Sequence, residues 1–299
     1  MIGVIFARQS ICAVNRCNLA CTYCWYETGA AGYPNSTVPT AVLARWFDRC
    51  RVAGPLSVAY LTGGEPLLRT DFDELLLTAH ESFTQVVVLS NATTVTEETA
   101  RRFAALGTRL HVSLDRVSPD LGDRVRGGTA ATLRGLHHLA AAGVPTRVTM
   151  IVTTRNHTDL PVVVELCRRL RLGLEVNPVA VPEVHPLSLR TLAASDRQAL
   201  IDGLAEARDL LGRPSYYARV ARYLRDGRVA PLGGCQAVAT GVFIEADGAI
   251  SLCGQRRHGL DNLGDVRSAS LDDVLAAHRR AGAARVPGSC VSLDCLTVA

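Results

Sequence analysis

Short apolar runs alternate with segments of helical periodicity along much of this chain, and this alternation constrains the fold more than any other feature. The expected strands cover residues 2–14, 56–61, 86–89, 110–114, 148–153 and 174–176. The expected helices cover residues 38–51, 71–82, 97–106, 129–142 and 158–170. Such alternation predicts an α/β fold with a parallel sheet. A doubly wound sheet and a complete or partial barrel both fit it.

Beyond residue 177 the alternation gives way to helices and a hairpin. Asp247-Gly248 stands between two short apolar runs and predicts a β-hairpin with a tight turn. The expected elements are helices at 188–211, 216–224 and 271–280 and strands at 242–245 and 249–252. We therefore expect an α/β domain at 1–185, a helical connector at 186–230 and a small extension at 231–299.

The composition narrows the class of protein. Of the 299 residues, 48% are hydrophobic and 20% are charged, which supplies a full core and excludes disorder. The 32 basic residues, all of them arginine, are scattered, and only 5% of residues are aromatic, so we expect no nucleic-acid partner. The sequence has no apolar run of about eighteen residues and no signal-peptide pattern, which predicts a cytoplasmic protein without a membrane span.

Ten cysteines are unusual for a chain of this expected location. Disulfides are disfavoured in the cytoplasm, where clustered cysteines more often bind metal or carry out redox chemistry. Seven of the ten form two groups, which are Cys17, Cys21 and Cys24 near the start and Cys235, Cys253, Cys290 and Cys295 near the end. The other three are isolated along the sequence, and we expect them to be small buried hydrophobic residues, namely Cys12, Cys50 and Cys167.

The first cysteine group directly follows the first expected strand. Three residues separate Cys17 from Cys21, and two separate Cys21 from Cys24. Three thiolates on one short loop can hold three irons of a 4Fe–4S cluster and leave the fourth iron open to another ligand. A four-cysteine zinc site would normally need a second pair of cysteines nearby.

Further polar segments stand at the ends of successive expected strands. Thr62-Gly63-Gly64-Glu65-Pro66 follows the second strand, where glycines permit close backbone approach and a carboxylate can accept hydrogen bonds from an ammonium group. The other segments are Ser90-Asn91, Ser113-Leu114-Asp115 and Arg124-Val125-Arg126-Gly127. Together with the Cys-x3-Cys-x-aromatic-Cys pattern, in which Tyr23 is the aromatic residue, they resemble the radical SAM superfamily.

The resemblance implies which residues contact S-adenosyl-L-methionine (SAM). Gly63, Gly64 and Glu65 would bind the amino group of its methionine part. Ser90 and Asn91 match a Thr-Asn-Gly segment of relatives, although Ala92 replaces the glycine. Ser113 and Asp115 would contact the ribose. Arg126, rather than Arg124, matches an arginine that approaches the carboxylate, and Tyr23 belongs to the same cofactor-binding set.

The resemblance also implies the architecture and the cofactors. It implies a partial (β/α)6 TIM-type barrel, followed by a small Cys-rich extension of a β-hairpin and a helix. That extension resembles the auxiliary-cluster module called Twitch, a shortened form of SPASM. Its four cysteines, Cys235, Cys253, Cys290 and Cys295, would hold a second 4Fe–4S cluster in addition to the one held by Cys17, Cys21 and Cys24. The alternatives are a zinc site formed by the same four residues, or a core position for Cys253 on the hairpin with Cys290 and Cys295 in a disordered tail.

The implied reaction begins with reductive cleavage of SAM, and the resulting 5′-deoxyadenosyl radical removes a hydrogen atom from the substrate. Loss of a further electron to the auxiliary cluster would complete a dehydrogenation. Return of a hydrogen atom from a thiol would complete an epimerisation, which we favour because cysteines remain outside the two groups. Cys12 and Cys253 are the candidate hydrogen donors, and Cys167 is a further one.

The substrate class is inferred from size and resemblance. A compact chain with one Twitch-like extension resembles enzymes that modify sugars or aminocyclitols in aminoglycoside biosynthesis, so we expect a small carbohydrate substrate and a flavodoxin or ferredoxin as electron donor. Little room for an N-terminal peptide-recognition domain is expected ahead of the first strand. The alternatives are a maturase that modifies a ribosomally made peptide and a non-catalytic iron–sulfur or zinc module.

Overall fold

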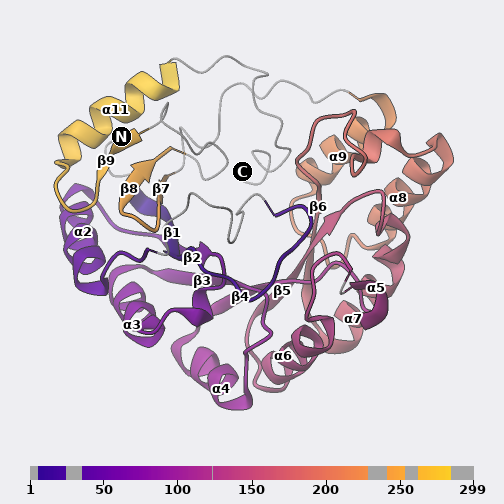
Figure 1. The fold of residues 1–299 in the computed structure, drawn as a ribbon, viewed down its shortest axis with the longest axis horizontal. Helices are drawn as coiled ribbons and strands as arrows, with labels where there is room; N and C mark the ends of the chain where they lie inside the picture. Colours follow the sequence, from indigo (N-terminus) through magenta and orange to yellow (C-terminus); the bar gives the residue numbers. More distant parts are fainter. Residues whose placement is uncertain (1–5, 25–35, 123, 228–240, 253–261, 284–299) are drawn as a thin grey trace.

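Six parallel strands form the main part of the molecule in the computed structural model, which describes residues 6–24, 36–122, 124–227, 241–252 and 262–283 (Figure 1). Each strand pairs with the next one along the chain. They are β1 (Arg8–Val14), β2 (Val58–Gly63), β3 (Gln85–Ser90), β4 (Arg109–Ser113), β5 (Thr146–Val152) and β6 (Gly173–Pro178). The predicted α/β fold with a mostly parallel sheet is confirmed.

The connecting helices cover one face of this sheet. They are α2 (Thr40–Ala53), α3 (Phe72–Ser82), α4 (Glu97–Leu106), α6 (Thr129–Ala141) and α7 (Leu160–Leu170). Figure 1 shows the strands as an arc with these helices on its outside. Strands in chain order, joined by crossovers of the same hand, place all their helices on one face. The sheet is therefore singly wound and barrel-like, and the doubly wound alternative is wrong.

The two faces of the sheet differ in character. Leu110, Val112 and Val148 are fully buried against the helices. Their strand neighbours His111 and Arg147 are only partly buried and lie on the opposite, concave face. A largely apolar core therefore fills the space between strands and helices, whereas polar side chains line the inside of the arc.

The predicted hairpin is present, and it joins the main sheet. β7 (Val242–Ile244) and β8 (Ala249–Ser251) pair antiparallel, and the amide of Gly248, at a φ of +100°, donates to Glu245 O at 3.0 Å. β7 also pairs in parallel with β1, in the register Ile11 to Ile244. The hairpin therefore extends the sheet on the free side of β1, and a strand that the sequence did not predict, β9 (Asn262–Asp265), pairs with β8.

Several element boundaries differ from expectation. Phe6 and Ala7, expected in the first strand, are helical, and residues 1–5 lie outside the described part of the chain. The single helix expected at 188–211 is a 3₁₀ turn, Leu189–Thr191, followed by α8 (Ala194–Glu206). The short helix α5 (Pro119–Gly122) was not predicted, whereas α9 (Pro214–Asp226) and α11 (Leu271–Ala283) occur where helices were expected. Among the described helices, none is both long and apolar enough to span a membrane.

Candidate functional site

The three-cysteine loop lies between the end of β2 and residues 124–126. Two amide hydrogen bonds hold its beginning, from Gly64 N to Val14 O at 2.8 Å and from Glu65 N to Arg16 O at 2.9 Å. A third holds its far side, from Thr22 N to Val125 O at 2.9 Å. Cys17, Cys21 and Cys24 are each partly buried along it. The loop is thus fixed on both sides by segments that the sequence analysis grouped with it.

Gly63 and Gly64 leave room for the backbone of this loop. A Cβ atom added at Gly63, where φ is +126°, would lie 2.2 Å from Val14 O, and one added at Gly64 would lie 2.3 Å from Arg16 O. Neither distance is compatible with a real carbon–oxygen contact. These glycines were expected to permit close approach to SAM, and the structure gives a second reason for them, which is the packing of the cysteine loop itself.

Glu65 is completely buried, and hydrogen bonds fix its carboxylate. Oε1 accepts from the Ser90 hydroxyl at 2.8 Å and from Leu67 N at 3.2 Å, and Oε2 accepts from Asn91 N at 2.7 Å. Burial raises the pKa of Glu65, and these hydrogen bonds oppose the rise. Glu65, Ser90 and Asn91, predicted from separate segments, therefore meet at the carboxyl ends of β2 and β3.

Asn91 connects this carboxylate to the cysteine loop. Its side-chain amide donates to Asn18 Oδ1 at 2.8 Å and lies 3.9 Å from the sulfur of Cys17. Thr132 of α6 donates to the carbonyl of Asn91 at 2.8 Å. The next residue, Ala92, has a φ of +56°, the left-handed region that favours glycine. Ala92 therefore adopts a backbone conformation that a glycine takes more easily.

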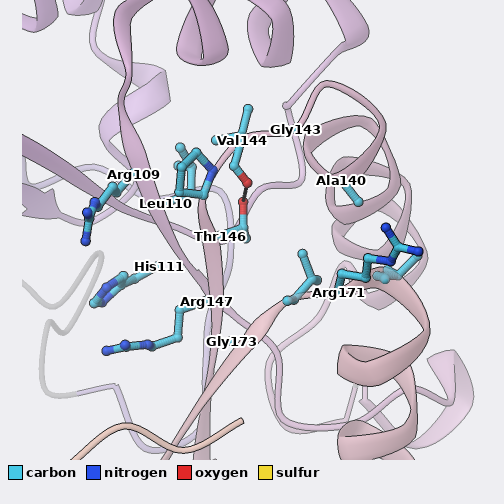
Figure 2. A pocket seen from close by; sticks show the side chains of 13 residues that line it. Arg109, Leu110, His111, Ala140, Gly143, Val144, Thr146, Arg147, Arg171 and Gly173 are labelled. Atoms are coloured by element: carbon cyan, nitrogen blue, oxygen red, sulfur yellow. Dashed lines mark hydrogen bonds between the residues drawn. The ribbon is translucent and has the colours of Figure 1, made fainter. Parts of the chain in front are cut away.

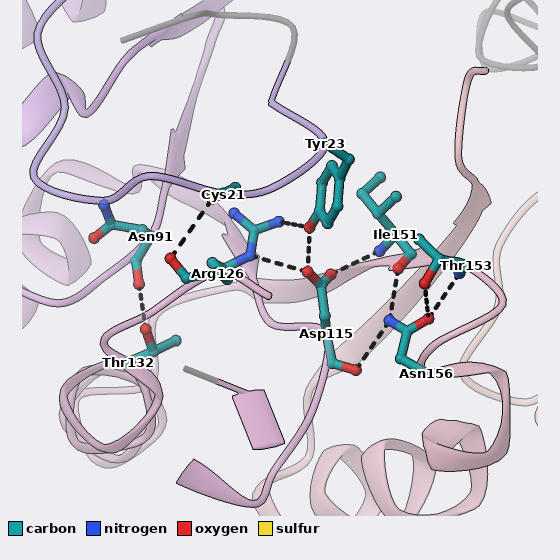
Figure 3. Close-up of polar contacts among 9 residues, drawn as sticks. All are labelled: Cys21, Tyr23, Asn91, Asp115, Arg126, Thr132, Ile151, Thr153 and Asn156. Atoms are coloured by element: carbon teal, nitrogen blue, oxygen red, sulfur yellow. Dashed lines mark hydrogen bonds and ion pairs between the residues drawn. The ribbon is translucent and has the colours of Figure 1, made fainter. Parts of the chain in front are cut away.

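Asp115 is the centre of a second set of contacts (Figure 3). Its Oδ2 accepts from the hydroxyl of Tyr23 and from Arg126 Nε at 3.2 Å, and its Oδ1 accepts from Ile151 N at 2.9 Å. Arg126 Nη2 also donates to the Tyr23 hydroxyl at 2.6 Å. Burial raises the pKa of Tyr23 well above its usual value, so the hydroxyl stays protonated and donates to the carboxylate. Asp115 thereby ties the cysteine loop to β4 and β5.

The other predicted residues occupy varied positions. Ser113 lies at the end of β4, opposite Thr149, and Arg124 is exposed.

Cys12 is buried on β1, where it packs with Phe243, Ala246 and Cys24, and its sulfur lies 3.6 Å from Val14 O. Cys167 and Cys50 are fully buried on α7 and α2, within the apolar core on the helical side of the sheet. Cys235, Cys253, Cys290 and Cys295 lie outside the described residues.

The three thiols of the loop fit a cluster better than a single ion. Within the described ranges, no three His, Cys, Asp or Glu side chains converge on one metal-ion position. A 4Fe–4S cluster binds each thiolate through a different iron, so its ligands need not converge. Burial raises the pKa of the Cys21 thiol to about 11, and the nearby Cys24 and Cys17 contribute to the rise, so a metal must displace protons to bind.

Arg69 is a contributor that the sequence analysis missed. Its guanidinium is buried and donates to Ala13 O, Val38 O and Thr40 Oγ1 at 2.8, 2.8 and 2.9 Å, and it pairs with Asp71 at 2.8 Å. It therefore fixes the last residues of β1, directly before the cysteine loop. The only sequence signal is its place shortly after the Gly-Gly-Glu segment, which by itself predicts nothing.

The comparison with protein families identifies the class of protein. A family model described as "Radical SAM superfamily" matches residues 11–167, slightly more than half of the chain. The chain belongs to this superfamily. The match spans β1 to α7 and contains the cysteine loop, Glu65, Asn91, Asp115 and Arg126. Membership implies a radical SAM enzyme with SAM and one 4Fe–4S cluster as cofactors.

The relatives have several different activities by name. The chain is 29% identical over 80% of its length to the PqqA peptide cyclase of Ruegeria pomeroyi and covers 65% of that protein. It is 32% identical over 52% of its length to an AdoMet-dependent heme synthase of Nitratidesulfovibrio vulgaris and covers 42% of it. It is 26% identical over 79% of its length to the mycofactocin maturase MftC of Mycobacterium tuberculosis and covers 61% of it. This chain thus spans less than two thirds of the length of these three relatives.

Solved structures agree on the fold. Native anSMEcpe with bound AdoMet superimposes with a TM-score of 0.72 at 16% identity, over 93% of this chain and 84% of that one. Streptococcus suis SuiB bound to S-adenosylmethionine gives a TM-score of 0.69 at 16% identity, over 90% of this chain and 65% of that one. At such identities the likeness concerns the fold alone.

Proposed function

We propose that this radical SAM enzyme modifies a peptide, as a maturase. The observation that carries the proposal is the alignment of about four fifths of the chain with a PqqA peptide cyclase and a mycofactocin maturase. A fold neighbour, SuiB of Streptococcus suis, has also been solved bound to its precursor peptide SuiA, with a TM-score of 0.68 at 17% identity. A sugar or aminocyclitol, which the sequence analysis favoured, finds no support in the names of the relatives given above.

The residues at the carboxyl ends of the strands have roles in this proposal. Cys17, Cys21 and Cys24 would hold the cluster, which when bound supplies the electron that cleaves SAM to a 5′-deoxyadenosyl radical. Glu65 would accept the ammonium group of SAM. A carboxylate has about four acceptor positions, and the three protein donors to Glu65 leave one on Oε2.

Asp115 and Arg126 would act chiefly by holding the cysteine loop in position. Asp115 already accepts from Tyr23, Arg126 and the amide of Ile151, so it holds the loop that carries the cluster. Arg126 uses Nε and Nη2 in these contacts, and its remaining N–H groups stay available for the carboxylate of SAM. Ser113 would contact the ribose from the end of β4.

The fate of the substrate radical depends on residues beyond this site. Cys235, Cys253, Cys290 and Cys295 would hold a second 4Fe–4S cluster, which would accept an electron in a dehydrogenation or a crosslink. In an epimerisation a thiol would return a hydrogen atom, and Cys12 is the candidate that lies on the inner side of β1, next to Cys24. A flavodoxin or ferredoxin would supply the electron for SAM cleavage.

The test uses the anaerobically reconstituted chain with SAM, a reductant and, as separate substrates in D2O, a short peptide encoded beside its gene and a panel of aminoglycoside intermediates. We expect the peptide to stimulate 5′-deoxyadenosine release and to change in mass. A gain of about one mass unit indicates epimerisation, and a loss of about two indicates dehydrogenation or a crosslink. Cys17→Ala should abolish release, whereas Cys50→Ala on α2 should not. A mass change in an aminoglycoside but not in the peptide would refute the proposal.

A further inference from the structure

The sulfur of Cys17, the first cysteine of the loop, lies close to the N–H groups of two residues. The backbone nitrogen of Leu19 is 3.4 Å from the sulfur. The side-chain nitrogen of Asn91 is 3.9 Å from it. Neutral sulfur is a weak acceptor, but a thiolate accepts hydrogen bonds more strongly because it is charged. Both groups therefore favour negative charge on this sulfur.

The direction of the Asn91 amide is set by its oxygen. Oδ1 accepts from the backbone amide of Thr93 at 2.9 Å and from the Thr93 hydroxyl at 2.6 Å. Because the oxygen faces Thr93, the nitrogen of the same group faces the cysteine loop. Nδ2 carries two hydrogens, which suit the two acceptors found there, namely Asn18 Oδ1 at 2.8 Å and the sulfur of Cys17.

Asn18 and Thr93 complete a ring of three side chains with Asn91. Asn18 Nδ2 donates to the Thr93 hydroxyl at 2.8 Å, and that hydroxyl donates its own hydrogen to Asn91. The backbone of Asn91 is held as well, because its amide donates to Glu65 at 2.7 Å and its carbonyl accepts from Thr132 at 2.8 Å (Figure 3). The Thr93 hydroxyl thus contacts both side-chain amides of the ring.

Hydrogen bonds to the ligand sulfurs of an iron–sulfur cluster change its reduction potential. Reduction adds one electron, and therefore one negative charge, to the cluster. An N–H group directed at a ligand sulfur stabilises the reduced form more than the oxidised form, because the reduced form carries more negative charge. An amide that turns away from the sulfur therefore makes the cluster harder to reduce.

We propose that Asn18 and Thr93 are positioning residues, which hold the Asn91 amide against Cys17 and thereby raise the reduction potential of the cluster. The inference rests on one part of the proposed function, which is the cluster held by Cys17, Cys21 and Cys24. It gives Asn91 a role beside the SAM contact expected from the sequence. The step concerned is the transfer of one electron from an external low-potential donor to the oxidised cluster, in which no covalent bond forms or breaks.

The test is a reductive titration of the anaerobically reconstituted full chain. Titanium(III) citrate is the one-electron reductant, and electron paramagnetic resonance follows the reduced cluster. The signal measured is the one that SAM alters, because SAM binds a cluster that has an open iron. We expect Thr93→Val, which is nearly isosteric but lacks the hydroxyl, to lower the ratio of reduced to oxidised cluster about threefold at a fixed potential. For one electron this is a fall of roughly 30 mV, at about 59 mV per tenfold change.

Two controls separate these hydrogen bonds from packing and from distant effects. Thr93→Ser keeps the hydroxyl and loses the methyl group, so it should keep the potential of the parent. Thr146→Val removes a hydroxyl that donates to Val144 O at 2.9 Å, beside a cavity of about 500 Å³ (Figure 2). Thr146 precedes Ile151, whose amide contacts Asp115, by about 16 Å along β5, so Thr146→Val should also keep the potential. The iron content should match the parent in all three variants.

Three outcomes would overturn the proposal. They are a potential that Thr93→Val leaves unchanged, equal shifts in Thr93→Val and Thr93→Ser, and an iron content in Thr93→Val as low as in Cys17→Ala, which would mean that the ring only holds the loop. A parent without a signal that SAM alters would refute the cluster assignment and this inference with it. Failure of the peptide-maturase proposal would instead appear as 5′-deoxyadenosine release that peptides do not stimulate, and the potentials would be unaffected.

Discussion

Replacing Gly64 with alanine should dislodge the cysteine loop from the end of β2. The new Cβ would lie 2.3 Å from Arg16 O, 2.5 Å from Arg16 C and 2.9 Å from Asn15 O. Carbon and oxygen atoms in contact are about 3.3 Å apart, so one backbone must move by about 1 Å. The atoms in the way are backbone rather than the end of a flexible side chain, and no rotamer change can relieve the clash.

The expected magnitude follows from the contacts that the shift breaks. Overpacking costs about 1–3 kcal/mol, and the amide bonds from Gly64 to Val14 and from Glu65 to Arg16 contribute about 1 kcal/mol each. We expect a loss of about 3–5 kcal/mol in the free energy of unfolding. At an unfolding entropy of about 2.1 cal/mol/K per residue, the melting temperature of a chain of this length falls by about 5–8 °C.

The assay combines thermal unfolding with the iron content per chain after anaerobic reconstitution. Gly173→Ala is the matched control, because the nearest atoms to its new Cβ belong to the Arg147 side chain, at 3.6 Å and beyond. We expect Gly64→Ala to lose both stability and iron and Gly173→Ala to keep both. If Gly64→Ala retained the melting temperature and iron of the parent, the packing explanation for this glycine would be wrong.

The remaining predictions concern three side chains that act by contact or by titration. Tyr23→Phe removes the hydroxyl between Asp115 and Arg126, so it should cost about 1–2 kcal/mol and lower the iron content. Arg69→Met leaves buried carbonyl groups and Asp71 without their donor and should cost about 3–5 kcal/mol in urea unfolding. Burial lowers the pKa of His111 from 6.5 to about 4, so only the unfolded chain takes up its proton between these values as the pH falls. The free energy of unfolding should therefore drop by about 2 kcal/mol between pH 7 and pH 5, and His111→Asn should remove that drop.

Each of these predictions has a matched control. Tyr60→Phe also loses a hydroxyl that accepts from an arginine, Arg8, at 2.9 Å, but it should keep its iron. Arg168→Met breaks an exposed ion pair with Asp209 and should cost less than about 1 kcal/mol. His137→Asn changes an imidazole on α6 and should keep the pH dependence. Equal effects in a variant and its control would contradict the corresponding prediction.

The regular elements were predictable where local signals are strong. The boundaries of α4 agree with the expected helix because Thr96 accepts a hydrogen bond from Thr99 N at 3.2 Å at its start and Gly107 takes a left-handed conformation at its end. The helix expected at 188–211 is interrupted, and a contact with a distant part of the chain accompanies the interruption. Arg190 donates to the carbonyls of Tyr223 and Leu224, at 3.0 and 2.8 Å, near the end of α9. Periodicity carries no information about that contact.

Motif spacing predicted which residues belong to the candidate site better than it predicted which of them contact one another. It grouped Glu65 with Asn91, and the structure joins them by a 2.7 Å hydrogen bond. It assigned Asp115 and Arg126 to different parts of SAM, whereas the structure joins the two to each other and to Tyr23. A motif reports which residue types recur at a strand end, but which of them pair depends on side-chain directions that spacing does not encode.

The pairing of β7 with β1 has a consequence for the order in which the protein can mature. The inner hydrogen-bonding edge of β1 stays open until residues 242–244 have been made, because Ile11 pairs with Ile244. Translation at 5–20 residues per second separates these two strands by roughly 10–50 s. During that interval the strand that leads into Cys17 has an unpaired edge, which is prone to association with other chains. Iron–sulfur loading into a settled cysteine loop is therefore a post-translational event, and slowing the synthesis of the last third of the chain should lower the yield of loaded protein.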